Sequence, residues 1–287
     1  MEMSEKIGLV LEGGGMRGTF TAGVLDYFLD KNINFPYTIG VSAGACNGVS
    51  YAAKQRGRAK MCNIDLYDKY KYISVKNLIL KRNLIDYDLL FNDFPEKIIP
   101  LDYDAYFANP GRTIFVASNC ETGEAEYLEE SSDRKRLNRI VMASSSLPFV
   151  AKITELDGKP MLDGGICDAI PVKKAMSDGC DKLVVVLTRN YGYRKANKEM
   201  FCPSFVYRQF PKLQNRLRRK YFDYNEVMDF IEENEKLGNM LVIRPEEKIE
   251  VSRLEKSVEK LEDLYSQGYE RARAVVEKNP EYFVFGR

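Results

Sequence analysis

IGLVLEGGGMRG, at residues 7–18, is the stretch of sequence that decides the fold. An apolar run from Ile7 to Leu11, with Gly8 inside it, is followed by Glu12, a glycine-rich segment and an apolar pattern suited to a helix. This order predicts a strand, a glycine loop and a helix. Glycines let the backbone come close to a ligand and point bare N–H groups at it, and the helix N-terminus adds a positive dipole. The loop therefore suits an anion or a developing oxyanion.

A second motif, GVSAG at residues 40–44, matches the GxSxG pattern of a nucleophile elbow. An apolar stretch ends at Val41 and small residues follow Ser42, which is the strand-to-helix context that this motif needs. The chain of 287 residues contains no histidine, so a Ser-His-Asp relay cannot operate. If Ser42 is a nucleophile, a different side chain must accept its proton.

The third motif, DGG at residues 163–165, offers a carboxylate in an expected turn. Asp163 is a candidate base, although Asp-Gly is also a common turn dipeptide. Glu12, Asp157 and Asp168 are further acids, and the sequence by itself leaves each of them open as the base.

Together these motifs resemble the patatin-like phospholipase family, in its bacterial hydrolase branch. GGGMRG at 13–18, GVSAG at 40–44 and DGG at 163–165 match the family's glycine loop, nucleophile and aspartate in register. The similarity extends to ASSSLP at 143–148 and to the segment around LVIRP at 241–245. The resemblance implies hydrolysis of a lipid acyl ester through a Ser-Asp dyad, without a metal or organic cofactor.

The resemblance also assigns roles to individual residues. Ser42 would be the nucleophile, Asp163 the base, and the amides of Gly14 and Gly15 the oxyanion hole. Arg17 would either support the loop or meet a substrate phosphate, for which its planar fork of donors is suited. The other motif glycines are Gly13, Gly18, Gly40, Gly44, Gly164 and Gly165.

The first fifty residues predict alternating strands and helices, with strands at about 6–12 and 36–41 and helices at about 18–30 and 43–55. The continuous apolar core of Lys182–Thr188 is typical of an interior parallel strand covered on both faces. We therefore predict a three-layer α/β/α fold with a mostly parallel sheet.

The rest of the chain is expected to complete one domain over residues 1–287, because the candidate catalytic residues must meet. Residues 60–110, including Leu78-Ile79-Leu80, break the rhythm and predict an irregular helical insertion that could cover the site. A C-terminal strand-helix extension is expected from about residue 240. The other predicted elements are strands at 113–118, 125–128 and 241–244 and helices at 134–143, 171–177, in pieces over 204–236, and at 251–278.

Composition limits the partners and the compartment. Lys and Arg total 43 against 42 Asp and Glu, a balance that gives no global field for nucleic acid. Six cysteines lie scattered without a CxxC pair, which favours reduced thiols over a metal site. The polar N-terminus and the lack of a run of about 18 apolar residues argue against export and membrane spanning. We expect a cytoplasmic protein with a lipid or other acyl-ester substrate.

The segment 201–220 is aromatic and basic, and two interpretations stay open for it. It is either a solvated helix face with some core aromatics or a surface for peripheral contact with an anionic membrane.

Two other classes of function match parts of the sequence. Gly13-x-Gly15-x-x-Gly18 also satisfies a dinucleotide-binding fingerprint, but the second predicted strand ends at Ser42 without the acid that would bind ribose. A non-catalytic or weakly active lipid-binding or regulatory protein on the same fold is the remaining alternative.

Overall fold

The computed structural model describes residues 5–74, 77 and 83–283. Within these residues, eight strands form one sheet in the order β5-β6-β3-β2-β1-β7-β8, and β4 pairs with β3. The strands are β1 (Ile7–Leu11), β2 (Tyr37–Val41), β3 (Arg112–Asn119), β4 (Ala125–Leu128), β5 (Thr154–Leu156), β6 (Lys159–Asp163), β7 (Lys182–Val186) and β8 (Met240–Ile243).

The sheet is mostly parallel, as predicted. β1 pairs in parallel with β2 and β7, β2 with β3, and β7 with β8. Only β4, β5 and β6 join by antiparallel pairing among the described strands. Every residue of β1 and β2 is buried, since helices cover both faces. The glycine loop after β1 and Ser42 after β2 therefore emerge side by side at the same edge of the sheet.

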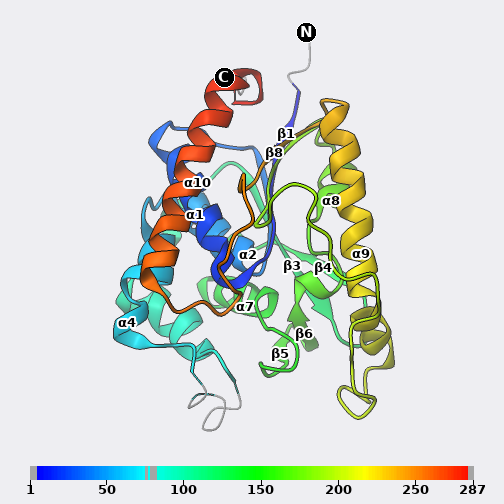
Figure 1. Ribbon diagram of the computed structural model, residues 1–287. Coiled ribbons are helices and arrows are strands. Elements are labelled where there is room, and N and C mark those ends of the chain that lie inside the picture. The colour runs from blue at the N-terminus through cyan, green and yellow to red at the C-terminus, as the bar shows by residue number, and fades with distance from the viewer. Residues whose placement is uncertain (1–4, 75–76, 78–82, 284–287) are drawn as a thin grey trace.

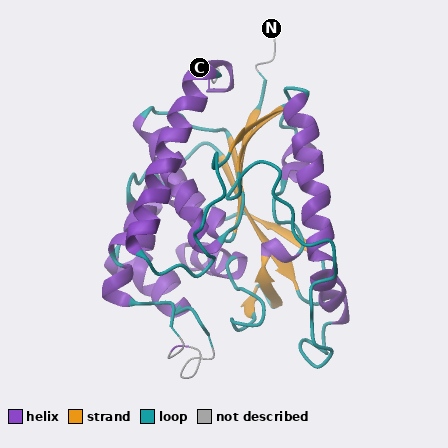
Figure 2. Cartoon of the chain, in the orientation of Figure 1, coloured by secondary structure: helices purple, strands orange, loops and turns teal. Residues whose placement is uncertain are grey.

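Helices pack on both faces of the sheet and complete three layers (Figures 1 and 2). One layer contains α1, α2 and α10, and the other contains α8 and α9. The helices are α1 (Thr19–Asp30), α2 (Ala43–Ala52), α3 (Arg58–Lys60), α4 (Tyr67–Tyr70), α6 (Tyr103–Phe107), α7 (Arg134–Ser144), α8 (Val172–Ser177), α9 (Pro211–Lys236) and α10 (Val258–Lys278). Short 3₁₀ segments lie at Gly15–Gly18, Gly164–Ile166 and Pro280–Phe283, and π-helical segments at Met61–Asp65 and Leu89–Ile98. None of the described helices combines the length and the apolar character needed to cross a bilayer.

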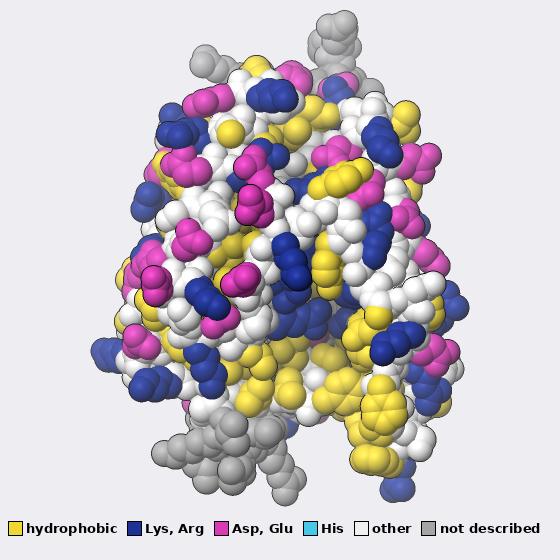
Figure 3. Space-filling model, viewed as in Figure 1, with side chains coloured by type: hydrophobic (Ala, Val, Ile, Leu, Met, Phe, Trp, Pro, Cys, Tyr) yellow, Lys and Arg dark blue, Asp and Glu magenta, His cyan; other side chains and the backbone are white. Residues whose placement is uncertain are grey.

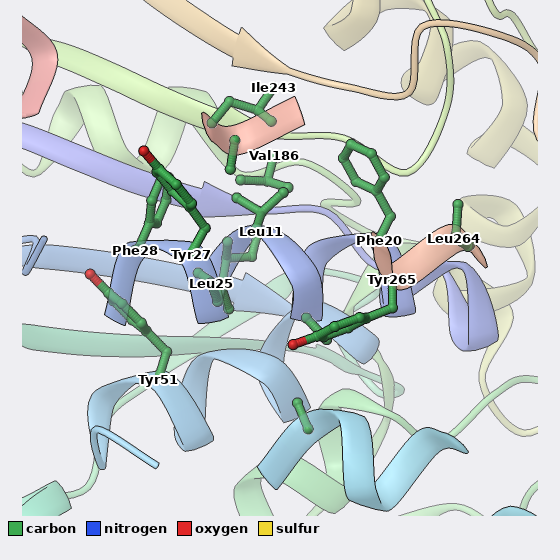
Figure 4. Packing of buried hydrophobic residues seen from close by; sticks show 14 of the residues in the cluster. Leu11, Phe20, Leu25, Tyr27, Phe28, Tyr51, Val186, Ile243, Leu264 and Tyr265 are labelled. Atoms are coloured by element: carbon green, nitrogen blue, oxygen red, sulfur yellow. The ribbon is translucent and has the colours of Figure 1, made fainter. Parts of the chain in front are cut away.

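The C-terminal helix is part of the core of this fold. Figure 4 shows Leu264 of α10 beside Phe20 of α1, and both belong to the same hydrophobic cluster as Leu11 and Ile243 of the sheet. The two helices approach so closely that a Cβ at Gly268 would lie 2.0 Å from the carbonyl oxygen of Phe20. Residues at the two ends of the chain therefore stabilise the same layer.

Some element boundaries differ from the predictions. α9 is one continuous helix from Pro211, whereas pieces from residue 204 were expected. α10 begins at Val258, seven residues later than predicted, because the side chain of Ser257 caps it by accepting a hydrogen bond from the Lys260 amide at 3.3 Å. Asp163 ends strand β6, where a turn was expected. The apolar piece Leu78-Ile79-Leu80 lies outside the described residues.

Candidate active site

Ser42 occupies the sharp turn between β2 and α2. Its backbone angles, φ 56° and ψ −120°, are costly for a residue with a side chain. The amide of Ser42 donates a hydrogen bond to the hydroxyl oxygen of Ser144 at 2.9 Å, which holds the turn. Gly44 allows close packing behind it, because a Cβ there would lie 2.4 Å from the carbonyl oxygen of Leu11. This is the strained strand-to-helix geometry that exposes a nucleophile at the edge of a sheet.

Asp163 is buried, with 3% of its surface exposed, at the end of β6. One carboxylate oxygen, Oδ1, accepts a hydrogen bond from the Gly165 amide at 2.8 Å. The other oxygen, Oδ2, has no hydrogen-bond partner among the described residues. Buried carboxylate oxygens are rarely left unpaired, so Oδ2 is available to a proton or a ligand.

A single small cavity joins these two side chains. Its wall contains Ser42, Asp163 and the glycine loop, together with Leu147 and Lys220. The side chains of Ser42 and Asp163 are not hydrogen-bonded to each other. The two predicted dyad residues thus line one cavity, but no hydrogen bond joins their side chains.

The glycine loop forms the opposite wall of this cavity. Gly14 and Gly15 both line it, and their amides donate to no acceptor among the described residues. Gly15 has φ 59°, and a Cβ there would lie 2.4 Å from the main-chain oxygen of Arg253. The next amide, that of Met16, donates to this same oxygen at 3.0 Å. The loop therefore presents two free N–H groups in the wall of the cavity that contains Ser42. Its conformation is held by the contact with the main-chain oxygen of Arg253.

Arg17 lies in a neighbouring cavity and does not line the one that contains Ser42. It is 6% exposed, and its guanidinium has no hydrogen-bond or ion-pair partner among the described residues. Burial, and then the charges of Arg189 and Arg253, lower the pKa of Arg17 to about 10. Of the two roles predicted for Arg17, support of the loop through side-chain hydrogen bonds is not seen among the described residues. Contact with a substrate phosphate stays a prediction.

The other candidate bases are engaged elsewhere. Asp168 accepts a hydrogen bond from the Tyr127 hydroxyl at 2.9 Å and lines a separate cavity, and burial raises its pKa. Asp157 forms an ion pair with Arg136 at 2.7 Å. Glu12 accepts hydrogen bonds on both of its carboxylate oxygens. The geometry therefore favours Asp163 among the four acids.

An apolar cavity of about 150 Å³ also begins at Ser42. Its wall continues along α2 to Val49 and is completed by apolar residues of the predicted insertion, such as Phe91 and Leu101. The described parts of residues 60–110 thus supply much of the enclosure around the serine. Apolar walls with a few polar groups at one end are typical of pockets for lipid chains.

Three cations near the serine were not predicted as site residues. Lys195, Lys220 and Arg253 line the cavity that contains Ser42 and Asp163. Lys220 belongs to the basic segment noted in the sequence, but nothing there separates it from solvated lysines. The sequence pattern predicts a helix at Arg253, whereas this residue lies in the connection between β8 and α10.

A mostly parallel α/β fold with a strained serine between strand and helix is typical of hydrolytic enzymes. The family model described as patatin-like phospholipase matches residues 9–176, and the chain belongs to this family. A second model, a domain of unknown function (DUF6363), matches residues 210–284.

Two curated relatives carry the same similarity. The chain is 35% identical over 188 residues to the uncharacterized protein YjjU of Escherichia coli K12, which covers 64% of this chain and 52% of that protein. It is 25% identical over 196 residues to lysophospholipase NTE1 of Candida glabrata, covering 63% of this chain and 10% of that protein. The chain therefore spans about half of the first relative and a small part of the second.

Among solved structures, VipD from Legionella pneumophila aligns with a TM-score of 0.48 and 14% identity, over 96% of this chain and 67% of that chain.

Proposed function

We propose that this protein is a serine acyl-ester hydrolase of the phospholipase A or lysophospholipase type, with Ser42 and Asp163 as a catalytic dyad. Membership of the patatin-like phospholipase family supports lipid hydrolysis in general. The observation that carries the finer proposal is the unpaired Oδ2 of buried Asp163, in the same cavity as the strained Ser42.

The first half of the reaction transfers the acyl group to the enzyme. Ser42 Oγ attacks the ester carbonyl while its proton passes to Asp163 Oδ2. The amides of Gly14 and Gly15 stabilise the oxyanion, and the N-terminus of α2 stabilises negative charge on the serine. When the tetrahedral intermediate collapses, the carbon–oxygen bond to the alcohol breaks and Asp163 returns the proton to the departing alcohol.

The second half releases the acid. Water attacks the acyl-enzyme carbonyl as Asp163 takes its proton, and the bond to Ser42 Oγ then breaks with the proton returned to that oxygen. The apolar cavity that starts at Ser42 holds the acyl chain throughout. The products are a fatty acid and the alcohol part of the substrate.

A fluorophosphonate probe followed by a lipid panel tests this function. We expect the wild-type protein to be labelled at Ser42 and to release fatty acid, and Ser42→Ala to do neither. Lipid binding without labelling or turnover would instead support the binding or regulatory alternative.

We also propose that the protein meets its substrate at an anionic membrane surface. Phe201 and Phe205 are 84% and 76% exposed, and Phe149 packs on Tyr207 with ring centroids 5.8 Å apart. Figure 3 shows a broad apolar area at the lower right of the face that it displays, with basic side chains at its border. Leu147, close to Phe149 in the chain, lines the cavity that contains Ser42. Exposed aromatics beside basic residues suit an anionic interface.

Vesicle sedimentation checks this contact. The double variant Phe201→Asp with Phe205→Asp should lose most binding to vesicles of phosphatidylglycerol and phosphatidylcholine. Leu237→Asp, which changes a residue that is 68% exposed at the other end of α9, is the matched control and should bind as the wild type does. Equal binding by both variants would remove this surface from the proposal.

A further inference from the structure

Seven basic side chains line one cavity of about 370 Å³ beside the active site: Arg17, Arg189, Arg194, Lys195, Lys198, Lys220 and Arg253. Three of them, Lys195, Lys220 and Arg253, also line the cavity that contains Ser42 and Asp163. Figure 3 shows Lys and Arg side chains gathered in the central hollow, directly above the apolar area. The basic cavity therefore opens onto the proposed reacting atoms.

Most of the positive charge in this cavity is not matched by acidic side chains in its wall. Glu12 is the one acid in its wall among the described residues. Its Oε2 accepts hydrogen bonds from the amide and hydroxyl of Thr188 at 2.6 and 3.0 Å, and its Oε1 accepts one from the Tyr224 hydroxyl at 2.9 Å. Glu12 thus bonds to the framework and forms an ion pair with none of the seven basic residues.

Two of these cations are buried without partners. Lys220 is 7% exposed, and its ammonium group has no hydrogen bond or ion pair to any described residue. Arg17 is 6% exposed, and its Nε is likewise unpaired. By contrast, Arg194 in the same wall is neutralised by Asp229 at 2.6 Å and Glu232 at 2.9 Å. Burying an unpaired charge costs free energy, and a bound anion would offset this cost. The cluster therefore has the features of an anion-binding site.

The titration of the lysines agrees with this geometry. Burial, followed by the charges of Lys220 and Arg253, lowers the pKa of Lys195 to about 6. The Lys195 ammonium lies 3.7 Å from the centre of the Tyr224 ring, which attracts it without neutralising it. Burial and Arg253 lower the pKa of Lys220 to about 8, against the opposing charge of Asp163. A bound anion would reverse these effects.

We propose that this cavity binds the phosphate of an acyl-ester substrate whose head group carries two or more negative charges and no cation, such as a phosphate monoester. This inference rests on the proposed function, because the acyl chain would lie in the apolar cavity with its ester at Ser42. A zwitterionic choline or ethanolamine head group would place an ammonium among these basic side chains. Lys195, Lys220 and Arg253 all lie outside residues 9–176, so the C-terminal part of the chain would select the substrate.

Binding to Ser42→Ala tests the site without turnover. Titration calorimetry would compare a lysophosphatidic acid, the lysophosphatidylcholine of the same acyl chain, and glycerol 3-phosphate. We expect the phosphate monoester lipid to bind at least tenfold more tightly than the other two. Tight binding of glycerol 3-phosphate alone would assign the cavity to a soluble phosphate, and equal binding of both lipids would overturn the anion selectivity.

Charge removal then tests the residues. On the wild-type background, Lys220→Gln should lower kcat/KM on the lysophosphatidic acid about 10- to 100-fold, the scale of one lost charge-assisted hydrogen bond. The loss on an uncharged monoacylglycerol should be at least tenfold smaller. Lys248→Gln removes an exposed charge from the same C-terminal connection as Arg253 but outside the cavity, and it should match the wild type.

Further comparisons distinguish a failure of the head-group proposal from a failure of the hydrolase proposal. If Lys220→Gln fails to fold, Arg253→Gln tests the same cavity from an exposed position. Equal losses on both substrates would overturn the head-group assignment while leaving the hydrolase proposal standing. If Ser42 is not labelled by a fluorophosphonate, the proposed function fails, but the calorimetry on Ser42→Ala still decides whether the anion site exists.

Discussion

The amide of Met16 donates a hydrogen bond to the main-chain oxygen of Arg253 at 3.0 Å. This bond joins the glycine loop after β1 to the connection that precedes α10. It also brings the Arg253 oxygen so close to Gly15 that only a residue without a side chain fits there. The conformation of the proposed oxyanion hole therefore depends on a segment more than two hundred residues further along the chain.

Gly15→Ala should show this dependence. The left-handed backbone alone costs about 1 to 2 kcal/mol for a residue with a Cβ, and the contact with Arg253 must add to that cost. Gly158→Ala is the matched control, because Gly158 also has positive φ, 75°, but no atom lies within 4 Å of the position that a Cβ would take there. Urea unfolding should show Gly15→Ala to be the more destabilised, and only this variant should lose turnover. Equal losses of stability would mean that the close contact is unimportant.

Ser42 should reveal the strain of its turn when it is replaced. Ser42→Ala and Ser42→Gly both remove the proposed nucleophile, so neither should be labelled by a fluorophosphonate. Glycine, however, relieves a backbone conformation that costs on the order of 1 to 3 kcal/mol in other residues. We expect Ser42→Gly to unfold at a higher temperature than Ser42→Ala, which differential scanning calorimetry can measure. The opposite order would argue against strain at this position.

Asp163 and Asp168 offer a direct comparison of two nearby carboxylates. Asp163→Asn keeps the size of the side chain but cannot accept the serine proton, so turnover should fall by a factor of about 10² to 10⁴. Asp168→Asn changes a residue that is bonded to Tyr127 in another cavity and should have a much milder effect. Steady-state kinetics with circular dichroism on both variants provide the measurement. A larger loss for Asp168→Asn would reassign the base, and no loss for either would end the dyad proposal.

Much of this architecture could be predicted from the sequence, because its signals are local. The apolar run Ile7–Leu11 and the Leu-Val-Val-Val-Leu run of 183–187 predicted central parallel strands, and the structure confirms the α/β/α fold. Short motifs indicated Ser42 and Asp163 as candidate site residues, and both line one cavity in the structure.

The remaining features depend on contacts between distant residues. Leu254 continues the apolar period of α10, so periodicity predicted a helix from residue 251, but the bond between Met16 and Arg253 holds that segment outside the helix. Lys195 and Lys220 resemble any surface lysine in the sequence, and only tertiary packing places them in the wall of the cavity that contains Ser42. Neither effect has a local signature.

Val49 should control the length of the acyl chain that the proposed hydrolase accepts. It lies two turns after Ser42 on α2, is 6% exposed and lines the apolar cavity. Val49→Phe would fill part of this space, so kcat/KM should fall for long acyl esters much more than for acetyl or butyryl esters. Val49→Ala is the control for a change in size at the same position and should spare long chains. If Val49→Phe lowers turnover equally for all chain lengths, the acyl chain lies elsewhere.

The buried Lys220 should make the stability of the free protein depend on pH. Its pKa is lowered from 10.5 to about 8, chiefly by burial and by Arg253, while Asp163 opposes this shift. Below pH 8 both the folded and the unfolded protein carry this proton, so the cost of burying the charge is fully present. Between about pH 8 and 10.5 Lys220 binds its proton more fully in the unfolded state than in the folded state, so its contribution to the free energy of unfolding rises with pH. Because tyrosines and cysteines also titrate there, the quantity to measure is the difference in unfolding free energy between the wild type and Lys220→Met. Relative to Lys220→Met, the unfolding free energy of the wild type should increase by on the order of 3 kcal/mol across this pH range. A difference that does not change with pH would show that Lys220 is not held as a buried, destabilised cation.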